Sequence, residues 1–123
     1  MTSALHVNRR AYERFPLQPM YTAITASCAD GHVIDGHAYD ISEGGMRIEL
    51  DDALKPGDRV IVEIKLPGSN ENIRARGDVV WVNDEIDDPG PRRHALQFAG
   101  FATATDHARL VSYLGQRRLR RAA

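Results

Sequence analysis

The chain has 123 residues, of which 42% are hydrophobic and 27% charged, the size and composition of one soluble globular domain that needs neither metal nor disulfide to fold. Its formal net charge of −1 and the lack of an apolar stretch long enough to cross a bilayer argue against nucleic-acid binding and membrane insertion. A single cysteine, Cys28, excludes an internal disulfide, and the N-terminus lacks the apolar core of a secretory signal, so we expect a cytoplasmic protein.

The first 20 residues show neither a helical nor a strand period. Pro16 and Pro19 oppose a helix in this stretch, because proline lacks an amide hydrogen and clashes with the preceding turn. The segment also carries several like charges and few apolar anchors. We therefore expect residues 1–20 to form a flexible, arginine-bearing arm ahead of one domain that covers residues 21–123.

Hydrophobic and polar residues then alternate in short runs that end at Gly, Pro, Asp or Asn, the pattern of strands joined by turns. The predicted strands cover residues 21–28, 33–41, 46–50, 60–66, 73–82 and 95–99. Asp35-Gly36 interrupts the second of them and indicates a bulge or a bend. Six closely spaced strands in one small domain predict an all-β fold, either a barrel or a sandwich.

The end of the chain changes to a helical period. Leu110 and Leu114 recur at helical spacing, and Thr103 followed by Asp106 forms a helix-capping pattern. The sequence thus predicts one amphipathic helix after the last strand. Four arginines gather in residues 117–121; such a run favours a solvated face, and the role of this basic tail stays open.

No arrangement typical of an enzyme is found. The five histidines are His6, His32, His37, His94 and His107. None stands at a metal-ligand spacing from another histidine, a cysteine or an acid, although His32 and His37 fall in one predicted hairpin. Cys28 lacks the context of a nucleophile, and no phosphate-binding glycine loop is present. We expect neither catalysis, nor a metal, nor a cofactor.

Three arginines, Arg9, Arg10 and Arg14, lie within six residues just ahead of the first predicted strand. A guanidinium is always charged, and its planar fork grips a phosphate with two hydrogen bonds. The same fork matches the O6 and N7 edge of guanine. The cluster therefore suits a ligand that contains phosphate and guanine, and the alternative is a solvated basic arm.

A second polar segment contains Asp40, Ser42 and Gly45 at the end of a predicted strand. A carboxylate complements the N1 and N2 donors of guanine, and a hydroxyl can donate to a phosphate. Gly45 has no Cβ, so the backbone can turn sharply or a ligand can approach closely there. The alternative is a polar turn in which Asp40 and Ser42 bind local backbone groups.

The two segments together resemble the hallmarks of the PilZ domain, a receptor family for cyclic di-GMP. The matching motifs are Arg10-x-x-x-Arg14 and Asp40-x-Ser42-x-x-Gly45. Three further segments, Lys55-Pro56-Gly57-Asp58, Val79-Val80-Trp81 and Leu96-Gln97-Phe98, are also similar to the family, whereas His94-Ala95 stands where a glycine is common. The resemblance extends from about Arg9 to about Leu119. It implies a PilZ-like split barrel, which is a six-stranded antiparallel β-barrel with a C-terminal helix.

The resemblance implies a role for each motif residue. Arg10 and Arg14 would bind phosphate and guanine, with Arg9 as an additional arginine. Asp40 and Ser42 would bind a guanine and the neighbouring phosphate, and Gly45 would let the strand turn beneath the ligand. Closure of the arm over the ligand would change the surface offered to an effector protein that the sequence does not identify.

Two other functions compete with a cyclic di-GMP receptor. Some PilZ-like domains act as protein-interaction modules without nucleotide, and the intact motif residues argue against this. A general nucleic-acid-binding barrel would need basic strands and exposed aromatic residues. Trp81 lies in the apolar run of residues 79–82, so we interpret it mainly as a core residue, with an edge at the ligand site as the alternative.

Overall fold

The computed structural model describes residues 14–17, 22–67, 72–83 and 92–122. The strands and the helix are β1 (Phe15–Pro16), β2 (Thr22–Cys28), β3 (Val33–Ile41), β4 (Gly45–Leu50), β5 (Arg59–Lys65), β6 (Asn72–Val82), β7 (Arg92–Phe101) and α2 (Ala104–Ala122). The predicted strands and helix are all present, with ends displaced by a few residues. No described helix is long and apolar enough to span a membrane.

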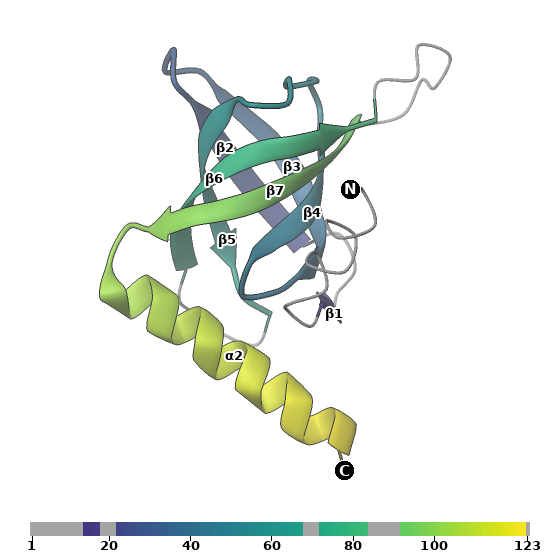
Figure 1. Cartoon of the computed structure of the whole chain (residues 1–123), viewed down its shortest axis with the longest axis vertical. Helices are drawn as coiled ribbons and strands as arrows, with labels where there is room; N and C mark the ends of the chain where they lie inside the picture. The colour runs from purple at the N-terminus through teal and green to yellow at the C-terminus, as the bar shows by residue number, and fades with distance from the viewer. Residues whose placement is uncertain (1–13, 18–21, 68–71, 84–91, 123) are drawn as a thin grey trace, which may run out of the picture.

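Six strands form a closed antiparallel barrel (Figure 1). The order around the barrel is β3, β2, β5, β6, β7 and β4, and pairing of β4 with β3 closes the circle. The two-residue β1 is an addition that pairs with the end of β3. Closure leaves no long unpaired edge, which removes the main route to strand-to-strand aggregation. The predicted all-β barrel with a C-terminal helix is confirmed.

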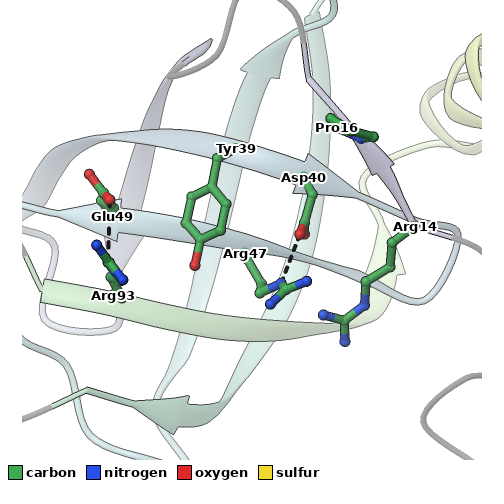
Figure 2. Close-up of a pocket in the computed structure, with 7 residues that line it drawn as sticks. All are labelled: Arg14, Pro16, Tyr39, Asp40, Arg47, Glu49 and Arg93. Atoms are coloured by element: carbon green, nitrogen blue, oxygen red, sulfur yellow. Dashed lines mark ion pairs between the residues drawn. The ribbon is translucent and has the colours of Figure 1, made fainter.

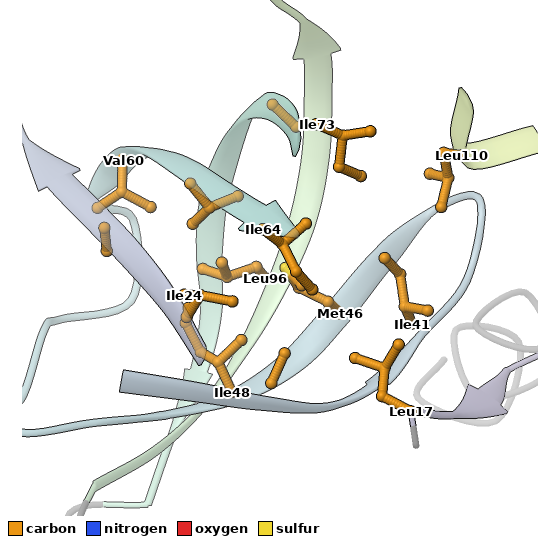
Figure 3. Packing of buried hydrophobic residues seen from close by; sticks show 14 of the residues in the cluster. Leu17, Ile24, Ile41, Met46, Ile48, Val60, Ile64, Ile73, Leu96 and Leu110 are labelled. Carbon is orange, nitrogen blue, oxygen red and sulfur yellow. The ribbon is translucent and has the colours of Figure 1, made fainter. Parts of the chain in front are cut away.

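The barrel interior is filled by the alternate apolar residues of each strand (Figure 3). Met46, Ile48 and Leu50 of β4 are all buried, as period-two alternation requires. Val60, Val62 and Ile64 do the same on β5. The intervening residues therefore face outward, and the functional side chains described below come from this outer face.

Helix α2 begins with the predicted capping arrangement. The Asp106 amide donates to Thr103 Oγ1 at 3.1 Å, and the Thr103 hydroxyl donates to Asp106 Oδ2 at 2.6 Å. The Arg74 amide of β6 donates to Asp106 Oδ1 at 2.9 Å, which ties the helix start to the barrel. Leu110 and Leu114 are fully buried, so the first half of the helix packs against one end of the barrel (Figure 1).

Part of the segment expected to be a flexible arm is packed on the barrel instead. Phe15 and Leu17 are buried, and the Leu17 amide donates to the Tyr39 carbonyl at 3.0 Å. Arg117 of α2 also donates to the Pro16 carbonyl at 3.0 Å. Residues 15–17 of the predicted arm thus contact the barrel and the helix, and burial of Phe15 and Leu17 stabilises these contacts. The earlier residues lie outside the described part of the chain.

Two details of the strands differ from the prediction. The irregularity in β3 falls between Ala38 and Asp40 and not at Asp35-Gly36. The interpretation of Trp81 as a core residue is wrong, because 51% of its surface is exposed. A register shift between Val79 and Trp81 explains this, since a bulge breaks the alternation and turns two consecutive apolar residues outward.

Candidate functional site

A hollow lies on the outer face of the barrel where β1, β3, β4 and β7 come together (Figure 2). Its volume is about 600 Å³, within the range of small-molecule sites. Polar and charged side chains dominate its walls. The lining residues are Arg14, Pro16, Tyr39, Asp40, Arg47, Glu49 and Arg93.

Pairing of β1 with β3 brings the two sequence motifs together. Pro16 lies opposite Asp40 and Phe15 opposite Ile41, so Arg14 directly precedes a strand that is fixed beside Asp40. Figure 2 shows the Arg14 and Arg47 side chains directed to the same side of the sheet, next to Asp40. Residues 26 positions apart in the sequence thus line one hollow.

Asp40 is mostly buried, and one of its two carboxylate oxygens has no hydrogen-bond partner among the described residues. Arg47 Nε lies 2.7 Å from Asp40 Oδ2, and the two residues face each other in the β3–β4 register. Oδ1 is buried and accepts no hydrogen bond from the described part of the chain. A buried oxygen without a donor is costly, so this atom is suited to accept a hydrogen bond from a ligand.

Neighbouring side chains hold Arg47 and the rest of the hollow. The Arg47 guanidinium lies over the Tyr39 ring, 6.0 Å from its centroid. Burial raises the pKa of Tyr39, so its hydroxyl stays protonated and able to donate. Glu49 Oε1 lies 3.6 Å from Arg93 Nε across the β4–β7 pair. Together with Arg14, the walls hold three guanidinium groups against two carboxylates, a balance that favours an anion.

Ser42 and Gly45 build the turn between β3 and β4. The Ser42 hydroxyl accepts from the amides of Gly44 at 3.1 Å and Gly45 at 3.2 Å, and the Ser42 amide donates to the Gly45 carbonyl at 2.8 Å. A Cβ on Gly45 would lie 2.0 Å from the Leu96 carbonyl oxygen, so glycine lets β4 approach β7. The polar-turn alternative thus applies to Ser42, whereas Asp40 pairs with a side chain.

The remaining predicted residues have different positions. Arg14 lines the hollow, and Arg9 and Arg10 lie outside the described residues. Trp81 does not line it, but shares the outer face of the barrel. In register, Asp40 lies opposite Arg47, Arg47 opposite Ala95, and Ala95 opposite Trp81. Two strand spacings, roughly 10 Å, therefore separate Trp81 from Arg47 across a small alanine.

Among the lining residues that motif reasoning missed are two arginines, Arg47 and Arg93. Arg47 occupies an outward position of β4, between buried Met46 and Ile48, and this alternation was visible in the sequence. Only the strand register, however, places it opposite Asp40. Arg93 is contributed by β7, which pairs with β4 although a long stretch of chain separates the two strands.

A sequence profile of the PilZ domain matches residues 8–116, which is nearly the whole chain. The chain belongs to the PilZ domain family. The match includes both motifs and the residues that line the hollow. A comparison with curated protein sequences gives no match.

Solved PilZ structures share the fold. The PilZ domain of YcgR from Escherichia coli, solved with c-di-GMP, has a TM-score of 0.66 and 21% identity, over 93% of this chain and 98% of that chain. The Bacillus subtilis inhibitor of motility MotI/DgrA has a TM-score of 0.71 and 22% identity, over 91% and 52%. The K. pneumonia MrkH–c-di-GMP complex gives 0.71 and 20%, over 93% and 54%. This PilZ chain thus spans about half the length of the MotI/DgrA and MrkH chains.

Proposed function

We propose that this PilZ domain is a receptor for cyclic di-GMP that binds the nucleotide in the hollow on the outer barrel face. The observation that carries the proposal is the β1–β3 pairing, which brings Arg14 of one motif beside Asp40 of the other. The c-di-GMP in the solved complexes of YcgR and MrkH, which share the fold, supports the same ligand. The domain would act by binding and not by catalysis.

Asp40 would recognise a guanine. The N1 and N2 hydrogens of guanine match a carboxylate, and Asp40 Oδ1 is the oxygen without a donor in the described structure. Arg47 would hold Oδ2 and thereby orient the carboxylate. A carboxylate that is already oriented before binding favours affinity, because less side-chain freedom is lost when the ligand binds.

The arginines would bind the two phosphates and the remaining guanine edges. Arg14 and Arg47 line the hollow, and Arg10 and Arg9 precede Arg14 by four and five residues. Charge-assisted bonds from these side chains would order the N-terminal arm over the ligand. The ordered arm would present a changed surface to an effector protein, so that binding becomes a signal.

Ser42 and Gly45 would act mainly through the turn beneath the ligand. Ser42 is buried and already bonded to two amides, so a direct bond to phosphate requires its hydroxyl hydrogen to turn away from the Gly45 carbonyl, which lies 3.4 Å away. Trp81 would provide a flat apolar face for a guanine at the edge of the site, reached across Ala95.

Site variants test the proposal by calorimetry with cyclic di-GMP. Loss of one charge-assisted hydrogen bond costs about 1.5 to 3 kcal/mol, so Arg14→Ala and Asp40→Ala should each weaken binding about 10- to 150-fold. Arg76→Ala removes an exposed arginine of β6 that pairs with Gly100, seven residues along β7 from Arg93 of the hollow, and should bind like the parent. Equal affinity in all variants would contradict the site, and no binding by the folded parent would favour a nucleotide-independent interaction module.

A further inference from the structure

Three side chains of metal-ligating type meet at the tip of the β2–β3 hairpin. The Cys28 amide donates to the His32 carbonyl at 2.9 Å, and the Gly31 amide donates to the Cys28 carbonyl at 2.9 Å. Gly31 has a φ of 95°, in the left-handed region that glycine adopts without strain. The tight turn therefore folds Cys28, Asp30 and His32 toward one another.

Their donor atoms already form a compact group. The Cys28 sulfur, one Asp30 oxygen and one His32 ring nitrogen all lie within 4.8 Å of one another. Asp30 Oδ1 lies 2.5 Å from His32 Nδ1 and accepts the His32 amide at 3.1 Å. A tetrahedral zinc ion with bonds of about 2.0 to 2.3 Å holds its ligand atoms roughly 3.3 to 3.8 Å apart. Small side-chain rotations would bring the three groups to that geometry.

The local charge favours a cation. The Asp30 carboxylate lies beside the Cys28 sulfur and the His32 ring nitrogen, so the group includes a negative charge. The His32 amide and ring hold this carboxylate in place. A divalent ion between the three donor atoms would therefore meet an oriented carboxylate.

We propose that Cys28, Asp30 and His32 form a zinc-binding site at the hairpin tip, with water in the fourth position. A sulfur, nitrogen and oxygen donor set suits Zn²⁺ and not Mg²⁺ or Ca²⁺, which prefer oxygen ligands alone. As the Zn–Sγ bond forms, the thiol proton passes to solvent, and no atom changes oxidation state. Sequence reasoning found no metal-ligand spacing between a histidine and a cysteine or an acid, and so missed these alternate residues of a turn.

The zinc site is separate from the proposed nucleotide site. Val33 begins β3 beside the hairpin tip, and Asp40 lies seven residues further along the same strand. At the rise of an extended strand this is roughly 23 Å. Zinc binding and nucleotide binding can therefore be tested independently. Zinc would fasten the end of two barrel strands and raise the melting temperature by mass action.

Cobalt titration of the reduced full chain tests the proposal. Co²⁺ replaces Zn²⁺ in such sites, and a thiolate ligand gives a charge-transfer band that Zn²⁺ then abolishes by displacement. Cys28→Ser should lose the band while it keeps the parent fold by circular dichroism. His32→Ala should weaken binding by at least the roughly tenfold effect seen when a partner of a metal ligand is lost. His37→Asn, in the same hairpin, should bind like the parent.

Three results would overturn the zinc site. The first is a titration of the parent without a charge-transfer band. The second is unchanged affinity in His32→Ala, which would place the metal on other histidines. The third is a band that appears only with dimerisation by light scattering, which would indicate one ion shared by the Cys28 thiols of two chains.

Discussion

At the scale of single residues, Trp81 offers both a test and a probe. It is the chain's one tryptophan, and its side chain is exposed beside Ala95 on the outer face that carries the proposed site. Stacking of a base on an aromatic ring is worth about 1 to 3 kcal/mol, so Trp81→Ala should weaken cyclic di-GMP binding about 5- to 150-fold.

The intrinsic fluorescence of Trp81 gives the measurement for this prediction. Titration of the parent with cyclic di-GMP should quench or shift the emission in proportion to the calorimetric saturation. Trp81→Phe keeps an aromatic face and should retain most of the affinity. Two results together would show that Trp81 does not contact the ligand. The emission of the parent would not change on binding, and Trp81→Ala would bind with full affinity.

The variant Gly45→Ala tests whether this motif residue is needed for the stability of the fold. A Cβ at this position would lie 2.0 Å from the Leu96 carbonyl, so Gly45→Ala must push β4 away from β7. We expect a loss of about 1 to 3 kcal/mol in the free energy of unfolding, measured by urea denaturation. Gly115→Ala is the matched control, because nothing lies within 4 Å of its Cβ in helix α2. It should stabilise the protein by about 0.5 to 1 kcal/mol. Equal stability of the two variants would contradict this account.

At the scale of elements, the start of α2 is fastened by Asp106. This carboxylate accepts from the Thr103 hydroxyl and from the Arg74 amide of β6, so its loss removes a cap and leaves a strand amide without a partner. Asp106→Ala should lower the free energy of unfolding by about 1 to 2 kcal/mol in thermal or urea unfolding. Thr105→Ala changes an exposed residue of the same turn and should stay within about 0.5 kcal/mol of the parent. A similar loss in both variants would refute the capping role.

The sequence predicts the regular elements well and their exceptions poorly. Alternation identified β4 and β5, and the Thr103–Asp106 pattern identified the helix start, because these signals are local. The two-residue β1 has no local signal, since only its pairing with β3 and the burial of Phe15 define it. The bulge before Trp81 is likewise set by the β6–β7 register, so an apolar run alone cannot assign the face of that tryptophan.

The same division applies to the site. Motif residues Asp40 and Arg14 were found from the sequence, whereas Arg47 and Arg93 join them only through the register of β3, β4 and β7. Outward positions of a strand are visible in the sequence, but their neighbours across the barrel depend on pairings between distant segments. Sequence reasoning therefore identified two residues that line the hollow and not its other walls.

At the scale of the whole molecule, His94 makes stability depend on pH. Its ring is buried, Nδ1 donates to the Arg92 carbonyl at 3.0 Å, and Nε2 accepts the Leu54 amide at 3.0 Å, so the neutral ring serves both bonds. Burial lowers the pKa of His94 below its ordinary value near 6.5. The unfolded chain then takes up a proton before the folded chain does, so stability is highest above about pH 6.5 and falls as the pH drops below it.

Unfolding measured between about pH 5 and pH 8 checks this prediction. In His94→Gln the side-chain amide can replace the donor and the acceptor of the ring, and it does not titrate. Because the parent and the variant share the other histidines, a difference between their pH profiles comes from His94. The parent should therefore lose more stability than His94→Gln as the pH falls. If the free energy of unfolding falls by the same amount in both proteins as the pH drops, His94 does not cause the loss of stability in acid.

Helix α2 also contacts β1, although the two elements are far apart in the sequence. Arg117 of α2 donates to the carbonyl of Pro16, two residues after Arg14 and opposite Asp40 in the β1–β3 pair. The helix thus contacts the segment that carries a proposed ligand-binding arginine. A change in that segment on nucleotide binding would therefore reach a second face of the molecule.

The most direct measurement of the central proposal is a calorimetric titration of the folded full chain with cyclic di-GMP at moderate salt. We expect saturable binding with a defined number of nucleotides per chain. An excess of short single-stranded DNA should have little effect, because in the proposed complex Asp40 would recognise guanine through its N1 and N2 hydrogens, beyond a general attraction of anions. Heat that vanishes as salt rises, equal competition by DNA, or no binding by a protein with an intact melting transition would contradict the proposal.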